Sequence, residues 1–576
     1  MFIEENMHKE RFEQWFNSDK LNDTEKKELK SISDDQSEIL FRFGKDLEFG
    51  TAGMRGIIGL GTNMINVHVV KRATQALSEY IKTLGKKAMK RGVAISYDTR
   101  KYSFEFAYAS AIVLVSNGIN AHLFLDVHPV PMLSYAVRKL NAIAGIMITA
   151  SHNPKEYNGY KVYGEDGAQM SPLATEKVVR YIDEIGDPLS DKILYNENKQ
   201  KKIRFIKKSL DKSFYKEIKK LCLSREAVKI IGEQVKLVYT PVHGSGLIPV
   251  TTIFKKIGIN AMVVPEQQSK DCEFSTVNVP NPEYQETLTL GIKMADFKNA
   301  DVVIGTDPDC DRMGVAIRND KGEFITLSGN QTGILLLDYV LSRLEKKNKL
   351  DKNCFVAKSF VSTSMAKLIA DDYGVELMET PVGFKFIGEK IKEFDDTGKK
   401  KFVFGFEESC GFLRGTHARD KDAVVASMLF AEMVCYYTYK KVSIYSRLQE
   451  IYQKYGYVYD VNVSTVYHGL NAMKDMNATV DRLKNKAVTE IGGAKVEAVR
   501  DYLTLKRKLT DGGEEDIDST SNNALYYELE NGFVCVRPSG TEPKLKIYYS
   551  VKDKTEQDAI KAFEKIKEDF ESNVMR

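Results

Sequence analysis

The sequence has few of the features that mark secreted, membrane-bound or nucleic-acid-binding proteins. Its 576 residues include seven cysteines, which are scattered and never form a C-x-x-C pair. An odd and unpatterned set of this kind predicts free thiols in a reducing compartment. No apolar run approaches the ~18 residues of a membrane span, and the first residues, MFIEENMHKERFEQWF, contain no apolar signal region. We therefore expect a soluble, cytoplasmic protein with no membrane partner.

The sequence also lacks a large excess of charge of either sign. It holds 84 basic and 80 acidic residues, which leaves a net charge of +4. A nucleic acid calls for a dense basic face, so we expect no nucleic-acid partner. The local basic stretch at residues 199–208, KQKKIRFIKK, is expected to be a solvated helix or linker face. The length of the chain predicts several domains of about 150 residues each.

What the sequence does contain is one pattern that occurs three times. A short apolar strand is followed by a loop, a helix that ends at a glycine, and a second strand, starting at residues 93, 236 and 354. The glycines Gly118, Gly258 and Gly374 suit the position just after a helix end. This order is typical of a right-handed parallel βαβ crossover. Spacings of about 120 to 140 residues are too long for a solenoid repeat and indicate related domains in series.

The C-terminal part of the chain follows a different pattern. A polar stretch at residues 511–523 precedes two alternating strands, FVCVRPSG and LKIYYSV, and an amphipathic helix from Glu556. We therefore predict the α/β class, with three related mixed α/β domains that contain βαβ units and a fourth, α+β domain. The predicted units are an N-terminal helical extension over residues 1–40, α/β domains over 41–205, 206–320 and 321–450, and the α+β domain over 451–576.

The first candidate site is the stretch TASHNPKEYNGYKVYG, which directly follows the apolar run AIAGIMI. Ligands of parallel sheets gather at the carboxyl ends of strands, and Ser151 lies just beyond such an end. The stretch does not match the G-x-S-x-G elbow of a hydrolase. A plain turn built on Asn153 and Pro154 is the competing interpretation when this stretch is considered alone.

The second candidate is the stretch GTDPDCDR, which places Asp307, Asp309 and Asp311 at alternate positions after an apolar strand. Three crowded carboxylates repel one another unless a cation neutralises them. Ligands that are all oxygen favour Mg²⁺ or Mn²⁺ over zinc. An EF-hand loop is excluded, because Arg312 and Arg318 stand where its glycine and its bidentate glutamate belong. A solvated acidic turn remains the alternative.

Two further stretches have the composition of ligand-binding loops. In VRPSGTEP the guanidinium of Arg537 and the two hydroxyls suit a phosphate cradle, and a hairpin turn is the alternative. In FGFEESCGF the acids and Ser409 suit hydrogen bonds to sugar hydroxyls, and a helix start is the alternative. Three single cations, Arg55, Lys161 and Lys421, would each be surface residues if they were considered alone.

The stretches TASHNP with YNGYK, GTDPDCDR, GFEESCG and RPSGTEP, in this order, make the sequence resemble the α-D-phosphohexomutases. The resemblance extends from about residue 40 to the C-terminus. LEFGTAGMRG and TPVGFKFIGEKI are most similar to the phosphoglucomutase branch of that family. The family fold has three similar α/β domains and a different fourth domain around one central cleft, which agrees with the repeats.

The resemblance implies a role for each matching position. Ser151 would be the phosphoserine that donates and recovers a phosphoryl group, and one of its oxygens would complete a Mg²⁺ site. The implied metal ligands are Ser151, Asp307, Asp309 and Asp311. The implied catalytic residues beside the phosphate are His152, Arg55 and Arg312, with Lys161 and Lys421 for proton transfer. The implied substrate-binding residues are Glu407, Ser409, Lys385, Arg537, Ser539, Gly540 and Thr541.

Some family members have histidines where this chain has Phe384 and Gly411, so we favour Lys421 for acid–base work. The implied activity is the interconversion of glucose 1-phosphate and glucose 6-phosphate, with some use of mannose phosphates. Glucose 1,6-bisphosphate would be the intermediate and activator, and the only partner would be a small phosphosugar. A phosphopentomutase, a glucose-1,6-bisphosphate synthase, a metal-dependent phosphatase and a non-catalytic phosphosugar-binding protein are the alternatives. We expect a monomer or a weak homodimer.

Overall fold

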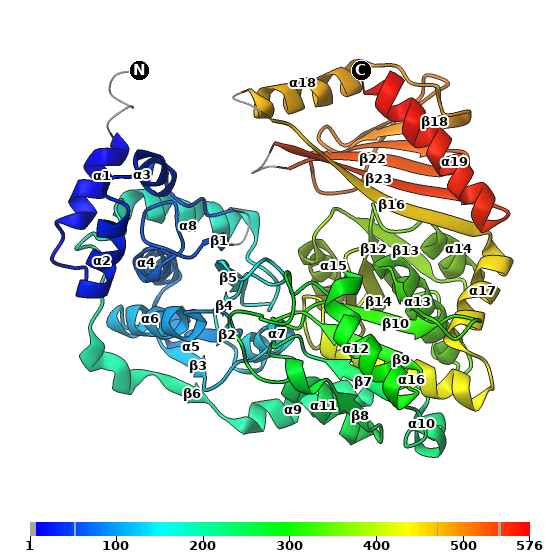
Figure 1. Cartoon of the computed structure of the whole chain (residues 1–576), viewed down its shortest axis with the longest axis horizontal. Helices are drawn as coiled ribbons and strands as arrows, with labels where there is room; N and C mark the ends of the chain where they lie inside the picture. Colours follow the sequence, from blue (N-terminus) through cyan, green and yellow to red (C-terminus); the bar gives the residue numbers. More distant parts are fainter. Residues whose placement is uncertain (1–6, 51–52, 469–470, 540–542, 576) are drawn as a thin grey trace.

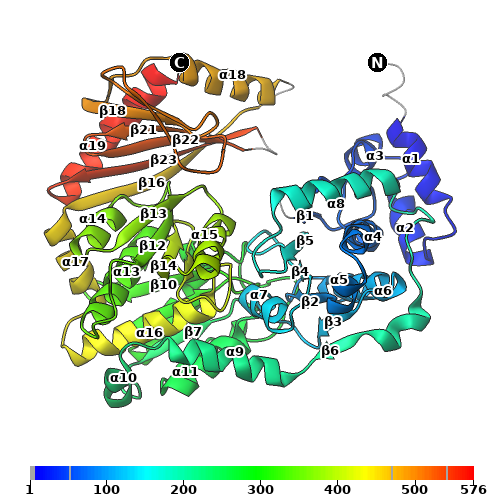
Figure 2. The same ribbon diagram turned by 180° about the vertical axis from the view of Figure 1, so that it is seen from behind.

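The computed structural model describes residues 7–50, 53–468, 471–539 and 543–575. Its four sheets follow one another around an arc, from the N-terminal sheet to the C-terminal one (Figure 1), and the same order is visible from behind (Figure 2). Three sheets mix parallel and antiparallel strands, while the fourth is antiparallel throughout. The predicted fold class is confirmed. Within the described residues, no helix is long and apolar enough to span a membrane.

Three short helices precede the first sheet and pack around the buried Trp15 and Phe43. The first sheet has the order β1-β5-β4-β2-β3-β6. The helices of this part are α1 (Met7–Phe16), α2 (Asp23–Ser31), α3 (Gln36–Phe43), α4 (Val67–Thr83), α5 (Lys86–Arg91), α6 (Ser103–Ser116), α7 (Val130–Lys139) and α8 (Pro172–Ile185). The strands are β1 (Gly53–Ile57), β2 (Val93–Tyr97), β3 (Ala121–Phe124), β4 (Ala144–Ile148), β5 (Tyr157–Gly164) and β6 (Arg204–Ile206).

The second and third sheets have the orders β11-β10-β9-β7-β8 and β13-β12-β14-β15. Their strands are β7 (Leu237–Thr240), β8 (Ala261–Val263), β9 (Val302–Thr306), β10 (Met313–Arg318), β11 (Phe324–Leu327), β12 (Cys354–Ser359), β13 (Glu376–Thr380), β14 (Lys401–Glu407) and β15 (Gly411–Leu413). Their helices are α9 (Lys208–Lys220), α10 (Arg225–Ile231), α11 (Leu247–Ile257), α12 (Gln285–Lys298), α13 (Gly329–Glu345), α14 (Met365–Asp372), α15 (Phe384–Thr397), α16 (Ala423–Tyr439) and α17 (Ile444–Tyr455).

The fourth sheet has the order β16-β23-β22-β21-β18-β19-β20, and β17 pairs with β18. Its elements are β16 (Tyr457–Val466), α18 (Ala472–Asn485), β17 (Glu490–Ile491), β18 (Ala494–Asp501), β19 (Lys506–Leu509), β20 (Glu514–Asp516), β21 (Leu525–Leu529), β22 (Gly532–Pro538), β23 (Lys544–Asp553) and α19 (Glu556–Asp569). This domain has an apolar core of its own, whereas one continuous core runs through the second and third sheets and reaches α7.

The first three sheets share a topological unit. In each, a central strand pairs in parallel with two neighbours. The strand β2 pairs with β3 and β4, the strand β7 pairs with β8 and β9, and the strand β12 pairs with β13 and β14. The predicted βαβ repeats are therefore confirmed. In each sheet the neighbour that comes later in the chain then pairs antiparallel with the next strand, β5, β10 or β15. The loops β4–β5, β9–β10 and β14–β15 are thus equivalent positions of one repeated unit.

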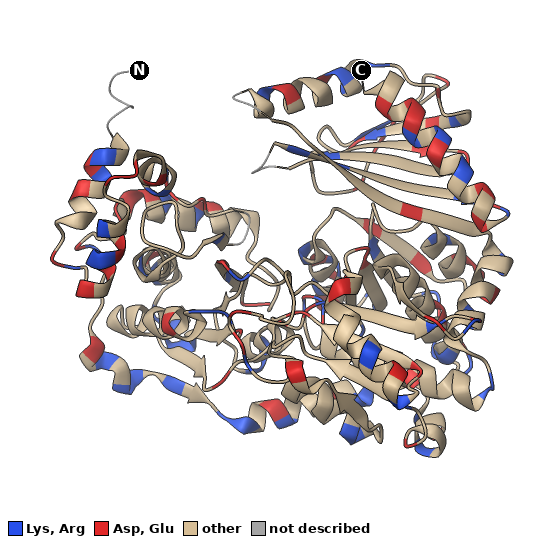
Figure 3. Ribbon diagram, in the orientation of Figure 1, with Lys and Arg blue, Asp and Glu red and all other residues tan. Residues whose placement is uncertain are grey.

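Lys and Arg are interspersed with Asp and Glu over all parts of the fold (Figure 3). The central strands carry few of these charges, because they are buried on both faces. All five residues of β2 and of β4 are buried. Strands that are covered on both faces are expected to be mainly apolar, as the stretches VAI and AGIMI are.

Candidate active site

Each of the three equivalent loops carries one of the predicted stretches. Ser151 lies in loop β4–β5, the three aspartates lie in loop β9–β10, and Ser409 lies in loop β14–β15. Each loop also contains a non-glycine residue in the left-handed region, with φ of 53° at Ser151, 51° at Cys310 and 60° at Cys410. Such conformations cost energy and persist only where the surroundings enforce them. The repeat thus supplies three constrained loops at corresponding strand ends.

A buried network holds the loop of Ser151. The guanidinium of Arg100 donates hydrogen bonds to the carbonyl oxygens of Ser151 (2.7 Å) and Pro154 (2.8 Å). The Asp98 carboxylate accepts from the hydroxyl of Thr149 (2.6 Å), whose oxygen accepts from the backbone N–H of Ser151 (2.8 Å). Arg100 and Asp98 are almost fully buried. The turn is therefore fixed by side chains that follow β2, not by its asparagine and proline alone.

The serine hydroxyl faces the acidic loop. Ser151 Oγ donates a hydrogen bond of 2.9 Å to Asp307 Oδ2, and it lies 3.2 Å from His152 Nδ1. Burial, together with the positive charges of Arg312 and Arg55, lowers the pKa of His152. A histidine in this position is neutral and does not add positive charge to the site.

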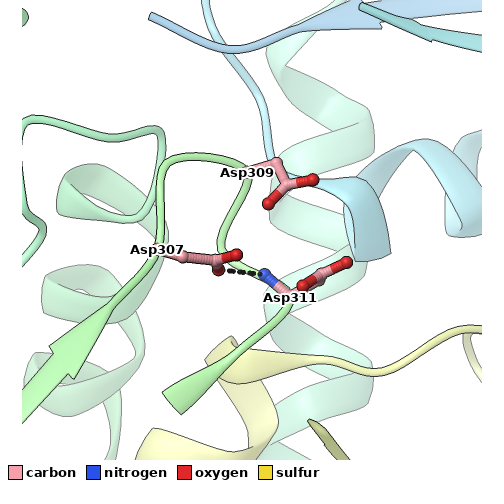
Figure 4. A group of neighbouring side chains, drawn as sticks. All are labelled: Asp307, Asp309 and Asp311. Atoms are coloured by element: carbon pink, nitrogen blue, oxygen red, sulfur yellow. Dashed lines mark hydrogen bonds between the residues drawn. The ribbon is translucent and has the colours of Figure 1, made fainter. Parts of the chain in front are cut away.

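The three aspartates converge around one bend of the β9–β10 loop (Figure 4). One oxygen of each lies within 4.8 Å of one oxygen of the others, and all three side chains are buried. Asp307 Oδ1 accepts the backbone N–H groups of Asp311 (3.0 Å) and Arg312 (2.9 Å), which shapes the bend. Burial and the neighbouring aspartates raise the pKa of Asp307 and of Asp311.

The donor set of this cluster fits a hard cation. Among the described residues, Asp309 Oδ1 and Asp311 Oδ1 are buried and accept no hydrogen bond. A buried carboxylate oxygen without a donor is costly unless a cation binds it. Three carboxylates and no nitrogen or sulfur ligand match the preference of Mg²⁺ or Mn²⁺. The cluster is therefore a candidate metal site.

Cations from three domains surround the aspartates. Lys161 Nζ on β5 lies 2.9 Å from Asp309 Oδ2, and Lys421 Nζ lies 2.9 Å from Asp311 Oδ2. Lys421 is buried, which would lower its pKa, but Asp311 and other acids raise the pKa overall. Arg312 forms an ion pair with Glu283. The fold therefore brings Lys161, Lys421 and Arg312 together around the acidic loop beside Ser151, as the sequence predicted.

A central cavity of about 640 Å³ borders this cluster. Its lining includes six of the predicted residues, Arg55, Ser151, Lys161, Asp311, Arg312 and Lys421. The pairing of β1 with β5 places Arg55 opposite Gly159, beside Lys161. A Cβ atom at Gly159 would lie 2.5 Å from the carbonyl oxygen of Thr149, so the close approach of this strand to the serine loop requires glycine.

The predicted sugar-binding residues lie outside the lining of this cavity. Glu407 ends β14 and is buried, and its Oε1 accepts the backbone N–H of Gly383 at 2.8 Å. Burial, opposed by Lys421, raises its pKa to about 7. Ser409 is half-buried in the following turn. Lys385, in the first turn of α15, places its ammonium 4.8 Å from the ring centre of Phe386.

The predicted phosphate loop lies at a second cavity, of about 850 Å³. Arg537 and Ser539 line one side of it, and residues of α8 line the other. Glu48 and Gly50 border both cavities, so the two adjoin. We call the second one the distal cavity. Gly540 and Thr541 lie outside the described residues.

Comparison with known proteins identifies four family domains in this order. Models of the phosphoglucomutase/phosphomannomutase family match as α/β/α domain I at residues 46–188, domain II at 212–322, domain III at 328–455 and the C-terminal domain at 476–567. The chain belongs to the phosphoglucomutase/phosphomannomutase family. It is therefore an enzyme of the isomerase class that transfers a phosphoryl group within its substrate.

Individual members of the family are similar over most of their length. A phosphoglucomutase of Staphylococcus aureus (strain USA300) is 37% identical over 528 residues, which cover 91% of this chain and 93% of the relative. A phosphoglucomutase of Staphylococcus haemolyticus (strain JCSC1435) is 37% identical over 516 residues, which cover 88% and 91%.

Solved structures of the family share the fold. The open form of the Paramecium phosphoglucomutase parafusin has a TM-score of 0.66 at 18% identity and covers 92% of this chain and 95% of its own. A phosphoglucomutase/phosphomannomutase family protein from Burkholderia thailandensis has a TM-score of 0.65 at 17% identity, with 91% and 97% covered.

Several residues at this phosphoglucomutase/phosphomannomutase site were missed by the sequence analysis. Arg100 belongs to the stretch YDTR at the end of β2, and a polar cluster at a strand end is the signal that marks it. Ser245 follows β7 and donates from its N–H and its hydroxyl to the carbonyl oxygen of Pro308, both at 2.8 Å. These two hydrogen bonds help to fix the position of the acidic loop. Glu283 and Lys45, which lines the central cavity, carry no local signal.

Proposed function

We propose that this enzyme interconverts glucose 1-phosphate and glucose 6-phosphate through a phosphoserine at Ser151 and a glucose 1,6-bisphosphate intermediate. The observation that carries the proposal is the 2.9 Å contact between Ser151 Oγ and Asp307 Oδ2 beside a cavity lined with basic side chains from three domains. A phosphorylated serine here would meet Arg55, Lys161 and Lys421, all suited to a dianionic group. The phosphoglucomutase relatives support the choice of hexose.

In the first half-reaction, a bond forms between the phosphorus and a free hydroxyl oxygen of the bound sugar phosphate, and the bond from phosphorus to Ser151 Oγ breaks. The hydroxyl proton passes to a base. Lys161 is the candidate base, because it lies beside the aspartates next to the serine. Lys421 lies there too, and its raised pKa keeps it an ammonium that can give a proton to the departing Ser151 Oγ. The bisphosphate then turns end for end, and Ser151 Oγ takes the other phosphoryl group. Preorganised charges around the transferring group supply most of the rate enhancement.

The other groups have supporting roles in the proposal. Mg²⁺ held by Asp307, Asp309, Asp311 and an oxygen of the phosphoserine would neutralise charge that develops on the transferring phosphate. Arg537 and Ser539, with Gly540 and Thr541, would bind the phosphate that does not react, at either end of the sugar. Glu407 and Ser409 would bind hydroxyls at C3 and C4, which glucose and mannose share. Mannose 1-phosphate is therefore expected to be a slower substrate.

The test is a coupled assay of the purified chain with the 1-phosphates of glucose, mannose and ribose, with and without glucose 1,6-bisphosphate. We expect glucose 1-phosphate to give the highest kcat/KM, and Ser151→Ala to have no measurable turnover. Intact-mass analysis should find one phosphate on the active wild type and none on the variant. Loss of only a few-fold would contradict a covalent phosphoserine. Ribose 1-phosphate as the best substrate would make the enzyme a phosphopentomutase, and net formation of bisphosphate would make it a synthase.

A further inference from the structure

A strongly basic cavity lies between α10, α13 and α16, and it shares no lining residue with the central or distal cavity. Its volume is about 390 Å³, within the range of about 300–1,000 Å³ that is usual for small-molecule sites. One lining side chain, Glu226, is acidic. The basic side chains that line it are Arg225, Arg343, Lys346, Lys347 and Lys440. We call it the basic cavity.

Within the part of the chain that the structure describes, no carboxylate forms an ion pair with any of these five cations. The buried carboxylate of Glu432 lies nearby, and among the described residues only one of its oxygens is hydrogen-bonded. Its Oε1 accepts the backbone N–H of Leu223 (2.6 Å) and the hydroxyl of Tyr339 (2.7 Å). Glu226 and Glu432 are two carboxylates against five cations, so the protein compensates only part of the positive charge around the basic cavity.

Helix dipoles account for only part of this charge. Lys346 and Lys440 are the C-caps of α13 and α16, where the negative end of a helix dipole favours a cation. Arg225, in contrast, is the first residue of α10, where the dipole disfavours a cation. Burial and the charge of Arg343 lower the pKa of Lys347, although Glu432 opposes them. The position of Arg225 is therefore not explained by helix stability, whereas Lys347 follows the C-cap of α13, where the dipole favours a cation.

One guanidinium is held in place without a ligand. Arg343 lies over the ring of Tyr436, 4.4 Å from its centre, and donates a hydrogen bond of 3.1 Å to the Tyr436 hydroxyl. Its Nε is buried and has no hydrogen-bond partner. A guanidinium that is already ordered loses little entropy when it binds an anion, and its planar fork matches phosphate oxygens.

We propose that the basic cavity binds a small molecule that carries a diphosphate group. One phosphate brings about −1.5 to −2 charges, which is fewer than the uncompensated cations around the cavity. Two linked phosphates match the number and the spread of these cations over three helices. Because the lining is separate from that of the central cavity, this ligand does not compete directly with the sugar phosphate.

The experiment is a calorimetric titration of the metal-free full chain with inorganic pyrophosphate. We expect Lys347→Gln/Lys440→Gln, which changes two exposed side chains, to weaken the affinity at least tenfold. The matched control is Lys352→Gln, an exposed lysine of the same domain that does not line the cavity. The central and distal cavities are themselves proposed to bind phosphate groups, so their contribution is removed with Arg55→Gln/Arg537→Gln, which should retain the binding that Lys347→Gln/Lys440→Gln weakens.

Three outcomes would overturn the proposal. They are no binding of pyrophosphate to the wild type, unchanged affinity in Lys347→Gln/Lys440→Gln, and loss of affinity in Arg55→Gln/Arg537→Gln alone. Arg343→Gln serves as a second variant, and its melting temperature is measured because Arg343 packs on Tyr436. If it folds, its affinity should fall as well, and an unchanged affinity would count against the proposal.

Discussion

Two clusters of charged side chains join neighbouring domains, and they differ in how their charge is balanced. Between the third and fourth sheets, the fully buried Lys358 lies 2.8 Å from Glu379, which lies 2.9 Å from Arg500. Burial would raise the pKa of Glu379, but the two cations lower it to about 2. In the acidic loop of the second domain, burial and mutual repulsion raise the pKa of Asp307 and Asp311 instead.

The charges around Glu379 are fully paired, whereas the charges around the three aspartates are not. Glu379 has a cation on each side and holds two domains together, and it leaves nothing for a ligand to neutralise. The aspartates retain two buried oxygens without donors, so the folded protein keeps an unfavourable arrangement that a cation relieves. A cluster of charged side chains between domains therefore indicates a binding site only where the pairing is incomplete.

The largest expected effect is on activity at the unpaired cluster. In Asp307→Asn, kcat/KM should fall by a factor of about 10²–10⁴, since a lost metal ligand and a lost charge remove several kcal/mol of transition-state stabilisation. The stability of the same variant in excess chelator should not fall, because burial and the neighbouring aspartates disfavour the charged carboxylate and raise its pKa. Chemical unfolding in chelator measures this. A kcat/KM within tenfold of wild type would contradict the prediction.

Removing a charge from the paired cluster around Glu379 should instead lower the stability of the protein. Glu379→Gln leaves the ammonium of Lys358 buried without a carboxylate, and we expect a loss of about 2–3 kcal/mol in the free energy of unfolding. This is below the usual cost of breaking a buried pair because Glu379 is 32% exposed. Glu376→Gln on the same strand is the control, because its ion-pair partner Lys400 is 27% exposed, whereas Lys358 is 1% exposed. Equal stability of the two variants would remove the distinction between the clusters.

Metal binding should stabilise only proteins in which all three aspartates of the acidic loop are present. At a Mg²⁺ concentration of ~30 Kd, a ligand that binds the folded state alone adds about 2 kcal/mol. The melting temperature should therefore rise with Mg²⁺ in the wild type and in Glu379→Gln, and not in Asp307→Asn. Differential scanning calorimetry with and without chelator measures it. The same rise in all three proteins would place the metal elsewhere.

The last effect concerns the pH dependence of stability. Glu407 has its pKa raised from 4.5 to about 7 by burial, so the unfolded chain releases this proton at lower pH than the folded one. The contribution is therefore present below pH 4.5 and is lost as the pH rises to about 7. Relative to Glu407→Gln, the wild type should lose up to about 3 kcal/mol over this window. Glu379, whose pKa is lowered, should show the reverse slope below pH 4.5. Parallel curves for wild type and Glu407→Gln would refute this assignment.

The local structure of this protein was predictable from its sequence. The three strand–helix–strand units, the hairpin of Arg537 and the acidic loop after β9 were found at the expected places. Each depends on the spacing of apolar residues and on turn residues a few positions apart, which are visible in a short window. The rule that ligands gather at strand ends then identified the residues of loops β4–β5 and β9–β10.

Tertiary structure alone decided which of these loops meet. Ser151 contacts Asp307 across 156 positions of sequence, and Arg312 pairs with Glu283, a residue in no recognisable motif. Arg100 fixes the serine turn from another strand, and Lys385 lies against Phe386 and lines neither the central nor the distal cavity. Such contacts depend on how whole sheets pack on one another, because the packing sets which side chains are buried and which charges lie close together. No short stretch of sequence contains that information.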